Sequence, residues 1–208
     1  NGQYSGFPTE RGAKNYEGFQ LQMKKLAAAI YAADPDILAM MELENDGEDE
    51  YSSIQQFCDF LNIDGNRHYV IAYTTGLVGS YPIKTGILYD SSVVEIKDKA
   101  QYHSHPNFSR PSLFQRFIYK DSLEFVICAN HFKSKGSRNA KGLDMDQKDG
   151  QASYNYKRTL QAITLLDIID SLYFDEKIMV LGDFNAYSQE DPIQTLQSTN
   201  LNRLETAN

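Results

Sequence analysis

The sequence has little cysteine, which excludes two classes of protein at once. Its only cysteines are Cys58 and Cys128. Two cysteines cannot build a disulfide scaffold, and their separation is not that of a zinc motif. Each lies in an apolar stretch, so we expect both to be small buried side chains.

Long apolar runs are also missing. The longest unbroken run, residues 26–33, has eight residues, whereas a membrane-spanning helix needs about 20. No signal peptide is seen, but the chain begins with Asn rather than Met, so this absence says little about location. We expect the chain to be an interior piece of a longer protein.

Positive charge is in deficit, with 20 Lys and Arg against 28 Asp and Glu and a net charge of −8. Apolar residues make up 41% of the chain and aromatic residues 12%, enough for a hydrophobic core, which excludes a disordered chain. The length and the lack of repeats or linkers predict one domain over residues 1–208.

Apolar periodicity predicts helices that alternate with strands, with an antiparallel middle. One helix covers residues 19–30 and ends before Pro35, because the residue before proline leaves the helical conformation. The other helices are expected at 49–61, 152–172 and, in short form, after Asp191-Pro192. Strands are expected at 37–41, 69–73, 85–89, 93–97, 113–119, 124–130 and 178–181. The continuous apolar runs 37–41 and 178–181 are typical of strands buried on both faces. The pattern predicts a layered α/β domain.

The strongest chemical signal is Gly182-Asp183-Phe184-Asn185, directly after an expected buried strand. On an extended chain Asp183 and Asn185 point the same way, so a carboxylate and a carboxamide would project together from a strand end. Ligands in open α/β sheets bind at strand ends, and oxygen ligands suit magnesium. The alternative is a plain turn, which Asp and Asn also favour.

Two more strand ends carry chemistry. The strand 37–41 delivers Glu42, and Glu44 could share its face, although composition alone favours a solvated acidic loop. The strand 124–130 leads to His131, whose imidazole could act as a general acid or base near pH 7. A single histidine at a strand end is more often only held by a hydrogen bond.

The segment after His131 is cationic. Residues 132–143 contain no acid but include Lys133, Lys135, Arg138 and Lys141. In an acidic protein this pattern indicates a phosphate-contacting surface, with a plain solvated loop as the equal alternative. Further on, Asp144, Asp146 and Asp149 precede Gly150, which predicts either a calcium loop or an ordinary polar loop.

Taken in order, these segments resemble the endonuclease/exonuclease/phosphatase superfamily, with the DNase I-like fold. The resemblance rests on the Asp-Ile-Leu-x-x-x-Glu pattern at 36–42, on His131, and on Gly182-Asp183-Phe184-Asn185. In finer detail, further segments of the sequence are similar to the bacterial extracellular endonuclease branch (ExeM/NucH-like). Its segments are 11–13, 41–47, 83–89, 130–137, 182–187 and 190–193.

The resemblance implies a four-layer α/β/β/α sandwich, incomplete at both ends. The family's first strand, with an active-site asparagine, and its closing Ser-Asp-His strand have no counterpart here. We therefore expect residues 1–208 to be a partial domain that is catalytically inactive alone.

The resemblance also implies roles for single residues. Glu42 would hold a divalent metal, Mg²⁺ or Mn²⁺, with Ca²⁺ as a further option. Asp183, with Asn185 beside it, would orient the attacking water, and His131 would protonate the leaving oxygen or stabilise the transition state. Arg110 is similar to the family's phosphate-touching arginine. Lys133 and Lys135 are expected to contact substrate phosphate as well.

We therefore expect a metal-dependent phosphodiester hydrolase, a secreted, cell-surface or periplasmic endonuclease acting on DNA or RNA, and a monomer. One alternative is the same fold acting on a phospholipid or a small phosphorylated molecule. The cationic segment argues for a polyanion, and no clear exposed apolar hairpin, as a lipid enzyme would need, is seen. The other alternative is a catalytically degenerate binding module.

Overall fold

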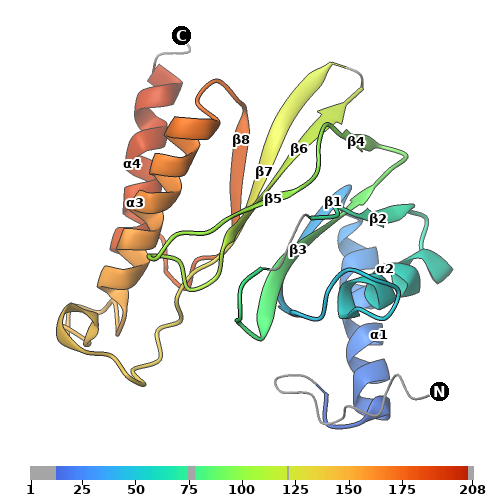
Figure 1. Ribbon diagram of the computed structural model, residues 1–208, viewed down its shortest axis with the longest axis horizontal. Helices are drawn as coiled ribbons and strands as arrows, with labels where there is room; N and C mark the ends of the chain where they lie inside the picture. The colour runs from blue at the N-terminus through green and yellow to red at the C-terminus, as the bar shows by residue number, and fades with distance from the viewer. Residues whose placement is uncertain (1–12, 75–77, 121, 206–208) are drawn as a thin grey trace.

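The computed structural model describes residues 13–74, 78–120 and 122–205. Two β-sheets lie face to face, with helices on both outer sides (Figure 1). In chain order the elements are α1 (Tyr16–Ala33), β1 (Ile37–Glu44), α2 (Ser53–Asp64), β2 (Tyr69–Ile71), β3 (Ile83–Asp90), β4 (Val94–Ile96), β5 (Gln101–His103), β6 (Ser112–Tyr119), β7 (Leu123–His131), the 3₁₀ turn η2 (Gly142–Asp144), α3 (Asn155–Leu172), β8 (Ile178–Asp183) and α4 (Asp191–Glu205). Arg11 and Gly12, which belong to the family resemblance, lie outside the described residues.

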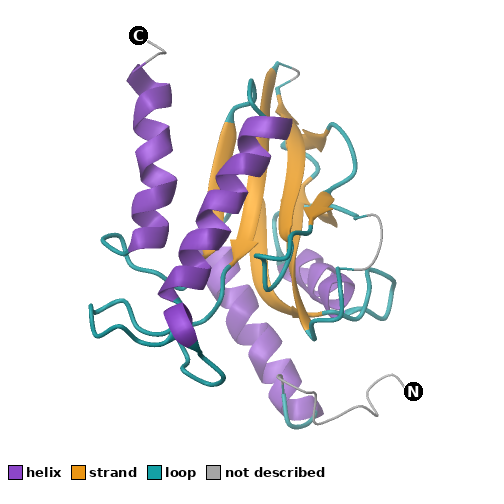
Figure 2. Ribbon diagram, turned by 60° about the vertical axis from the view of Figure 1, so that its left-hand side comes forward, coloured by secondary structure: helices purple, strands orange, loops and turns teal. Residues whose placement is uncertain are grey.

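The two sheets differ in topology. The first is antiparallel with the order β1-β3-β2, and the second has the order β4-β6-β7-β8 with β5 also paired to β6. In the second sheet only the β7–β8 pair is parallel among the described strands. Parallel neighbours need a crossover connection, and α3 supplies it by lying across the face of this sheet (Figure 2).

Three hydrophobic clusters correspond to the three interfaces between four layers. Ile87 meets Leu113 and Ile127 between the two sheets. Helices α1 and α2 cover the other face of the first sheet, and α3 and α4 cover the other face of the second. The expected α/β/β/α sandwich is confirmed.

The first helix follows its sequence signals. The Asn15 side chain accepts a hydrogen bond from the Gly18 N–H at 2.8 Å, and the helix ends at Ala33, with Asp34 in the left-handed region at φ 47°. The second helix begins later than residue 49, because Ser52 is its N-cap and Asp49 belongs to the turn before it.

The expectation that residues 37–41 and 178–181 are buried on both faces is wrong. Among the described strands β1 and β8 are the outermost of their sheets, and both are only partly buried; Met179 is 58% exposed. The strand buried at every position is β3, which lies between β1 and β2. An apolar run indicates a strand but does not tell whether the strand has neighbours on both sides. The short strand β5 was not expected at all.

Both cysteines are buried and neither forms a disulfide, as expected. Burial raises the pKa of the Cys58 thiol to about 11, which makes it unreactive at neutral pH. Within the described ranges, the helices are too short or too polar to cross a membrane.

Candidate functional site

Three side chains from three strands meet at one point; Glu42 lies inside β1, which continues to Glu44, and not at the strand end expected from the sequence. His131 ends β7 and Asp183 ends β8, and the parallel register places these two residues directly beside each other. Glu42 comes from β1 in the other sheet. The His131 Nε2 atom lies 3.9 Å from Glu42 Oε1 and 3.7 Å from Asp183 Oδ2. The fold therefore brings two carboxylates that are 141 positions apart in the sequence to one imidazole nitrogen.

A β-bulge aims Glu42. Met40 pairs with Gly86 and Leu43 with Lys84, so β1 holds one extra residue at this point. Glu42 has a φ of 62°, an uncommon value for a residue with a side chain. Bulges re-aim side chains at functional edges, and here the Glu42 carboxylate is turned outward and is 64% exposed.

Gly182 explains why the motif before Asp183 begins with glycine. Its φ is 136°, and a Cβ atom at this position would lie 2.0 Å from the Asn130 carbonyl oxygen. Any side chain would push β8 away from β7. The close approach of the two backbones sets Asp183 beside His131.

Asp183 and Asn185 do not project together from an extended chain, and that expectation is wrong. The strand ends at Asp183, and Asn185 takes a left-handed conformation with φ 49°. The Asn185 N–H donates to Asp183 Oδ1 at 2.9 Å, and its Nδ2 donates to the Phe132 carbonyl at 3.1 Å. Asn185 thus supports both Asp183 and the backbone next to His131.

The two kinds of group differ in exposure. The His131 side chain is 3% exposed, whereas the Asp183 carboxylate is 51% exposed. A buried imidazole has little freedom to rotate, while both carboxylates remain open to water and cations.

The donor set fits a magnesium-like cation. Mg²⁺ is commonly held by one or two carboxylates and completes its shell with water and substrate phosphate oxygens. Glu42 and Asp183 supply two such carboxylates. In the part of the chain that the structure describes, no group of three or more His, Cys, Asp or Glu side chains is arranged to hold a metal alone.

Arg110 lies under the site rather than at its surface. The residue is 6% exposed, and its Nε and Nη2 atoms donate to the carbonyl oxygens of His131, at 3.2 Å, and Phe132, at 2.7 Å. Its guanidinium also stacks over the Tyr81 ring at 5.1 Å. The contacts seen hold the backbone that carries His131, and contact with substrate phosphate stays a prediction.

Lys133 and Lys135 have different surroundings. The Lys133 ammonium lies 4.0 Å from the centre of the Tyr154 ring. Burial lowers the pKa of Lys133, and the nearby charges of Arg110 and Arg158 lower it further. Lys135 instead forms an ion pair with the buried Glu190 carboxylate.

The three aspartates of the expected calcium loop are not brought together. Asp144 Oδ1 accepts from the Lys157 N–H at 3.1 Å, at the start of α3. Asp146 binds the backbone and ammonium of Lys148, and Asp149 binds Gln151. Each carboxylate has its own local partner, so the polar-loop alternative describes this segment.

Residues at the start of α3 that the sequence pattern did not single out also belong to this region. Tyr154, Arg158 and Gln161 are buried and contact the cationic segment. Their spacing of four and three residues places them on one helical face, beside the apolar stripe of the same helix. That spacing was the sequence signal that could have grouped these three residues.

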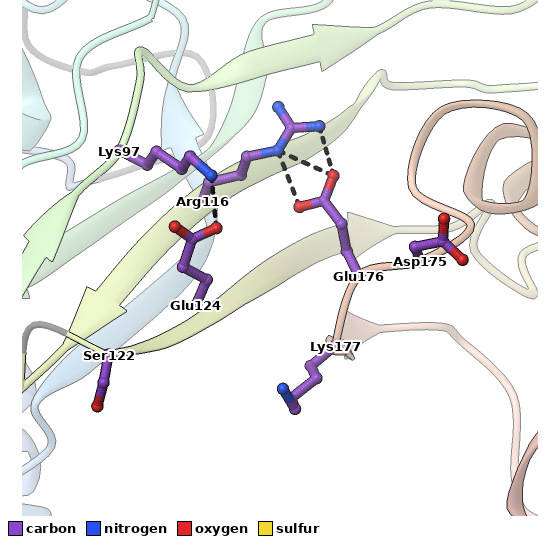
Figure 3. Close-up of a pocket in the computed structure, with 7 residues that line it drawn as sticks. All are labelled: Lys97, Arg116, Ser122, Glu124, Asp175, Glu176 and Lys177. Atoms are coloured by element: carbon purple, nitrogen blue, oxygen red, sulfur yellow. Dashed lines mark hydrogen bonds and ion pairs between the residues drawn. The ribbon is translucent and has the colours of Figure 1, made fainter. Parts of the chain in front are cut away.

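A charged cavity lies at the opposite end of β7, about 26 Å away along an extended strand. Figure 3 shows Arg116 binding Glu176 through Nε and Nη2, and Lys97 paired with Glu124. Arg116 also binds Asp98 through Nη1. Its lining residues are Lys97, Arg116, Ser122, Glu124, Asp175, Glu176 and Lys177. These ion pairs join the segment after β4, the strands β6 and β7, and the turn before β8, and we assign them a structural role.

Comparison with known proteins places this geometry in context. A family model described as "Endonuclease/Exonuclease/phosphatase family" matches residues 6–205. Protein angel of Drosophila melanogaster is 25% identical over 95% of this chain and 51% of its own length. The chain thus spans about half of this curated relative.

Solved structures share the fold at low sequence identity. The human Nocturnin catalytic domain with bound sulfate has a TM-score of 0.61 at 16% identity and covers 90% of this chain and 64% of its own. A conserved protein of unknown function from Enterococcus faecalis has a TM-score of 0.58 at 16% identity, with coverages of 87% and 65%. ANGEL2, a 2',3'-cyclic phosphatase, has a TM-score of 0.53 at 15% identity, with coverages of 86% and 48%.

Proposed function

Because this chain belongs to the endonuclease/exonuclease/phosphatase family, we propose that it is a metal-dependent phosphodiester hydrolase that acts on nucleic acid. The observation that carries the proposal is the meeting of His131 with the Glu42 and Asp183 carboxylates, each within 4 Å of the same nitrogen. An imidazole between two exposed carboxylates suits proton transfer beside a bound cation.

The roles follow from the contacts. Glu42 and Asp183 would hold Mg²⁺ or Mn²⁺. When bound, such a cation would stabilise charge on the phosphoryl oxygens and lower the pKa of a coordinated water from about 15.7. Asp183 would orient the attacking water from its exposed side. His131 would give a proton to the leaving oxygen, or stabilise its charge as imidazolium, while Arg110 and Asn185 keep its backbone in place.

The finer part of the proposal concerns the substrate. Residues 132–143 form a cationic segment next to His131 in a chain with a net charge of −8. Such a local reversal of charge favours a polyanion over a small phosphate ester or a neutral lipid. With the sequence resemblance, this supports an endonuclease of the bacterial extracellular branch that cleaves DNA outside the cell.

The test is a substrate panel with the full-length protein. Duplex DNA, single-stranded RNA, RNA ending in a 2',3'-cyclic phosphate, and phospholipid vesicles are each incubated with Mg²⁺, with EDTA, and with EDTA followed by excess Mn²⁺. We expect internal cleavage of DNA that EDTA abolishes and Mn²⁺ restores.

The panel also separates the alternatives. Opening of the cyclic phosphate without internal cleavage would replace the endonuclease by a phosphatase, the activity that the name of ANGEL2 states for that protein. Lipid hydrolysis alone would reject the nucleic acid substrate. Full activity in EDTA would remove the metal from the mechanism.

A further inference from the structure

One face of α3 holds the segment that follows His131. Tyr154, directly before the helix, and Arg158 and Gln161 within it lie at spacings of four and three residues. Tyr154 is 9% exposed, and Arg158 and Gln161 are fully buried. We call these three residues the α3 anchor.

The α3 anchor binds Lys133 at three points. The Lys133 N–H donates to Gln161 Oε1 at 2.8 Å, and the Lys133 carbonyl accepts from Arg158 Nη1 at 3.4 Å. The Lys133 ammonium lies 4.0 Å from the centre of the Tyr154 ring. The Tyr154 hydroxyl also donates to the Arg138 carbonyl at 2.7 Å. Both backbone polar groups and the charged end of Lys133 are therefore held by one helix.

The anchor also keeps the surroundings of Lys133 positive. The hydrogen bonds of Arg158 seen among the described residues go to the backbone carbonyls of Lys133, Ser153 and Gln151, which do not neutralise its charge. Lys135, two residues further, is neutralised by Glu190, which is 6% exposed. Of these two lysines, Lys133 is the one without a carboxylate bound to it in the described structure.

We propose that the α3 anchor consists of positioning residues that hold Lys133 beside His131, where its ammonium binds a substrate phosphate next to the scissile one, and that Lys135 does not share this task. The proposal rests on the proposed function and deepens it by naming the phosphate-binding cation. Burial and the charges of Arg110 and Arg158 lower the pKa of Lys133 and outweigh the opposite effect of Asp144, as expected for a cation that a bound anion would relieve.

The first experiment substitutes Gln161 in the full-length protein. Gln161→Met removes the acceptor for the Lys133 N–H. The Gln161 Nε2 atom has no hydrogen-bond partner among the described residues, so the acceptor bond is the one at stake. Gln115→Met is the matched control, because Gln115 is equally buried but its Nε2 bonds lie in the middle of the second sheet.

For Gln161→Met we expect KM for an oligonucleotide to rise about three- to tenfold with kcat changed less than twofold. Gln115→Met should lower the thermal midpoint while leaving KM unchanged. Equal KM values for Gln161→Met and Gln115→Met would overturn the positioning role.

The second experiment separates the two lysines by the salt dependence of oligonucleotide binding, measured in EDTA so that no cleavage occurs. Lys133→Gln should reduce the log–log salt slope by about 0.7 for a single strand, the value of one phosphate contact, and Lys135→Gln should leave it unchanged. The reverse result, or equal effects, would overturn the assignment of Lys133. Failure of the proposed function is distinct, because the wild-type protein would then neither cleave nor bind the oligonucleotide.

Discussion

Two charged segments look alike in the sequence. The acidic segment, residues 44–50, follows Glu42, and the cationic segment, residues 132–143, follows His131. Each carries charges of one sign near the end of a strand. In the structure they are built in opposite ways. In the acidic segment the charged side chains bind the backbone of the molecule. In the cationic segment other side chains bind its backbone, and part of its charge remains at the surface.

Asp46, Glu48 and Asp49 already accept hydrogen bonds within the molecule. Asp46 accepts from the Ser53 N–H at 2.8 Å, and Glu48 accepts from the Thr74 N–H at 2.9 Å and from its hydroxyl at 2.8 Å. Their negative charges therefore satisfy backbone N–H groups at the start of α2 and after β2.

In the cationic segment, Arg138 and Lys141 are exposed, and Lys133 is held by its backbone. A run of like charges can contribute to ligand binding only where the fold leaves its charged groups without partners inside the molecule. By this criterion we expect the cationic segment, not the acidic one, to face the substrate. Glu42 is set apart from the acids that follow it by its bulge.

The largest expected effect tests this separation of Glu42. Glu42→Gln and Asp183→Asn, made in the full-length protein, should each lower the rate of hydrolysis by about a hundredfold or more, because both keep side-chain size and lose the charge. Glu50→Gln, at an exposed position in the same acidic segment, is the matched control and should retain full activity. Activity above a tenth of wild type in either site variant, with the fold intact by circular dichroism, would remove that residue from the mechanism.

A second effect concerns backbone packing at two glycines, one near the end of β8 and one in the cationic segment. Gly182→Ala should destabilise the protein by more than about 2 kcal/mol, since its Cβ would collide with the Asn130 carbonyl of β7. Gly136→Ala, in the cationic segment, meets nothing within 4 Å and should change stability by less than about 1 kcal/mol. Urea unfolding of both variants measures the difference, and similar midpoints would show that the two strands can separate freely.

A smaller effect tests whether the cationic segment, and not the acidic one, uses its charge to bind nucleic acid. Replacing Lys133, Lys135, Arg138 and Lys141 together by Gln should flatten the salt dependence of duplex DNA binding, by about 0.9 in slope for each phosphate that the variant no longer binds, and raise KM more than it lowers kcat. Replacing Asp46, Glu48 and Asp49 by their amides should lower the thermal midpoint and leave the slope unchanged. If the slope responds to the acidic set and not to the cationic one, the comparison fails.

Much of the fold was predictable because it depends on local patterns. Pro35 marks the end of α1, and short apolar or β-rich runs mark most of the strands. The meeting of Glu42, His131 and Asp183 was predictable only through family resemblance, because spacing cannot tell which strands lie side by side. The structure supplies that information through the parallel β7–β8 register and the packing of β1 against both strands.

What the sequence could not show has two physical causes. The half-burial of β1 and β8 depends on which strands have neighbours, and this is a property of the whole sheet. The turn of Asn185 toward Phe132, and the place of Arg110 beneath the site, depend on which backbone carbonyls need a donor. Such needs arise only after the chain has folded, and polar residue types alone do not reveal them.

The smallest expected effect concerns Lys84, the buried cation that holds the acidic segment by donating to the Gly47 carbonyl. Burial lowers the pKa of Lys84 below its ordinary 10.5, although the charges of Glu48, Asp46 and Asp49 act in the opposite direction. Between the lowered folded-state pKa and 10.5, the unfolded chain binds more protons than the folded one. Stability from this group should therefore rise with pH across that window.

The measurement is urea unfolding at several pH values between about 8 and 10, a range below the ordinary lysine pKa, for wild type and for Lys84→Met. The free energy of unfolding of wild type should rise with pH relative to that of Lys84→Met, because the methionine keeps the length of the side chain and cannot titrate. Other groups that titrate in this range are common to both proteins and cancel in the difference. A difference that falls with pH would mean that the acidic neighbours outweigh burial, and that the acidic segment uses its charge on Lys84 as well as on backbone N–H groups.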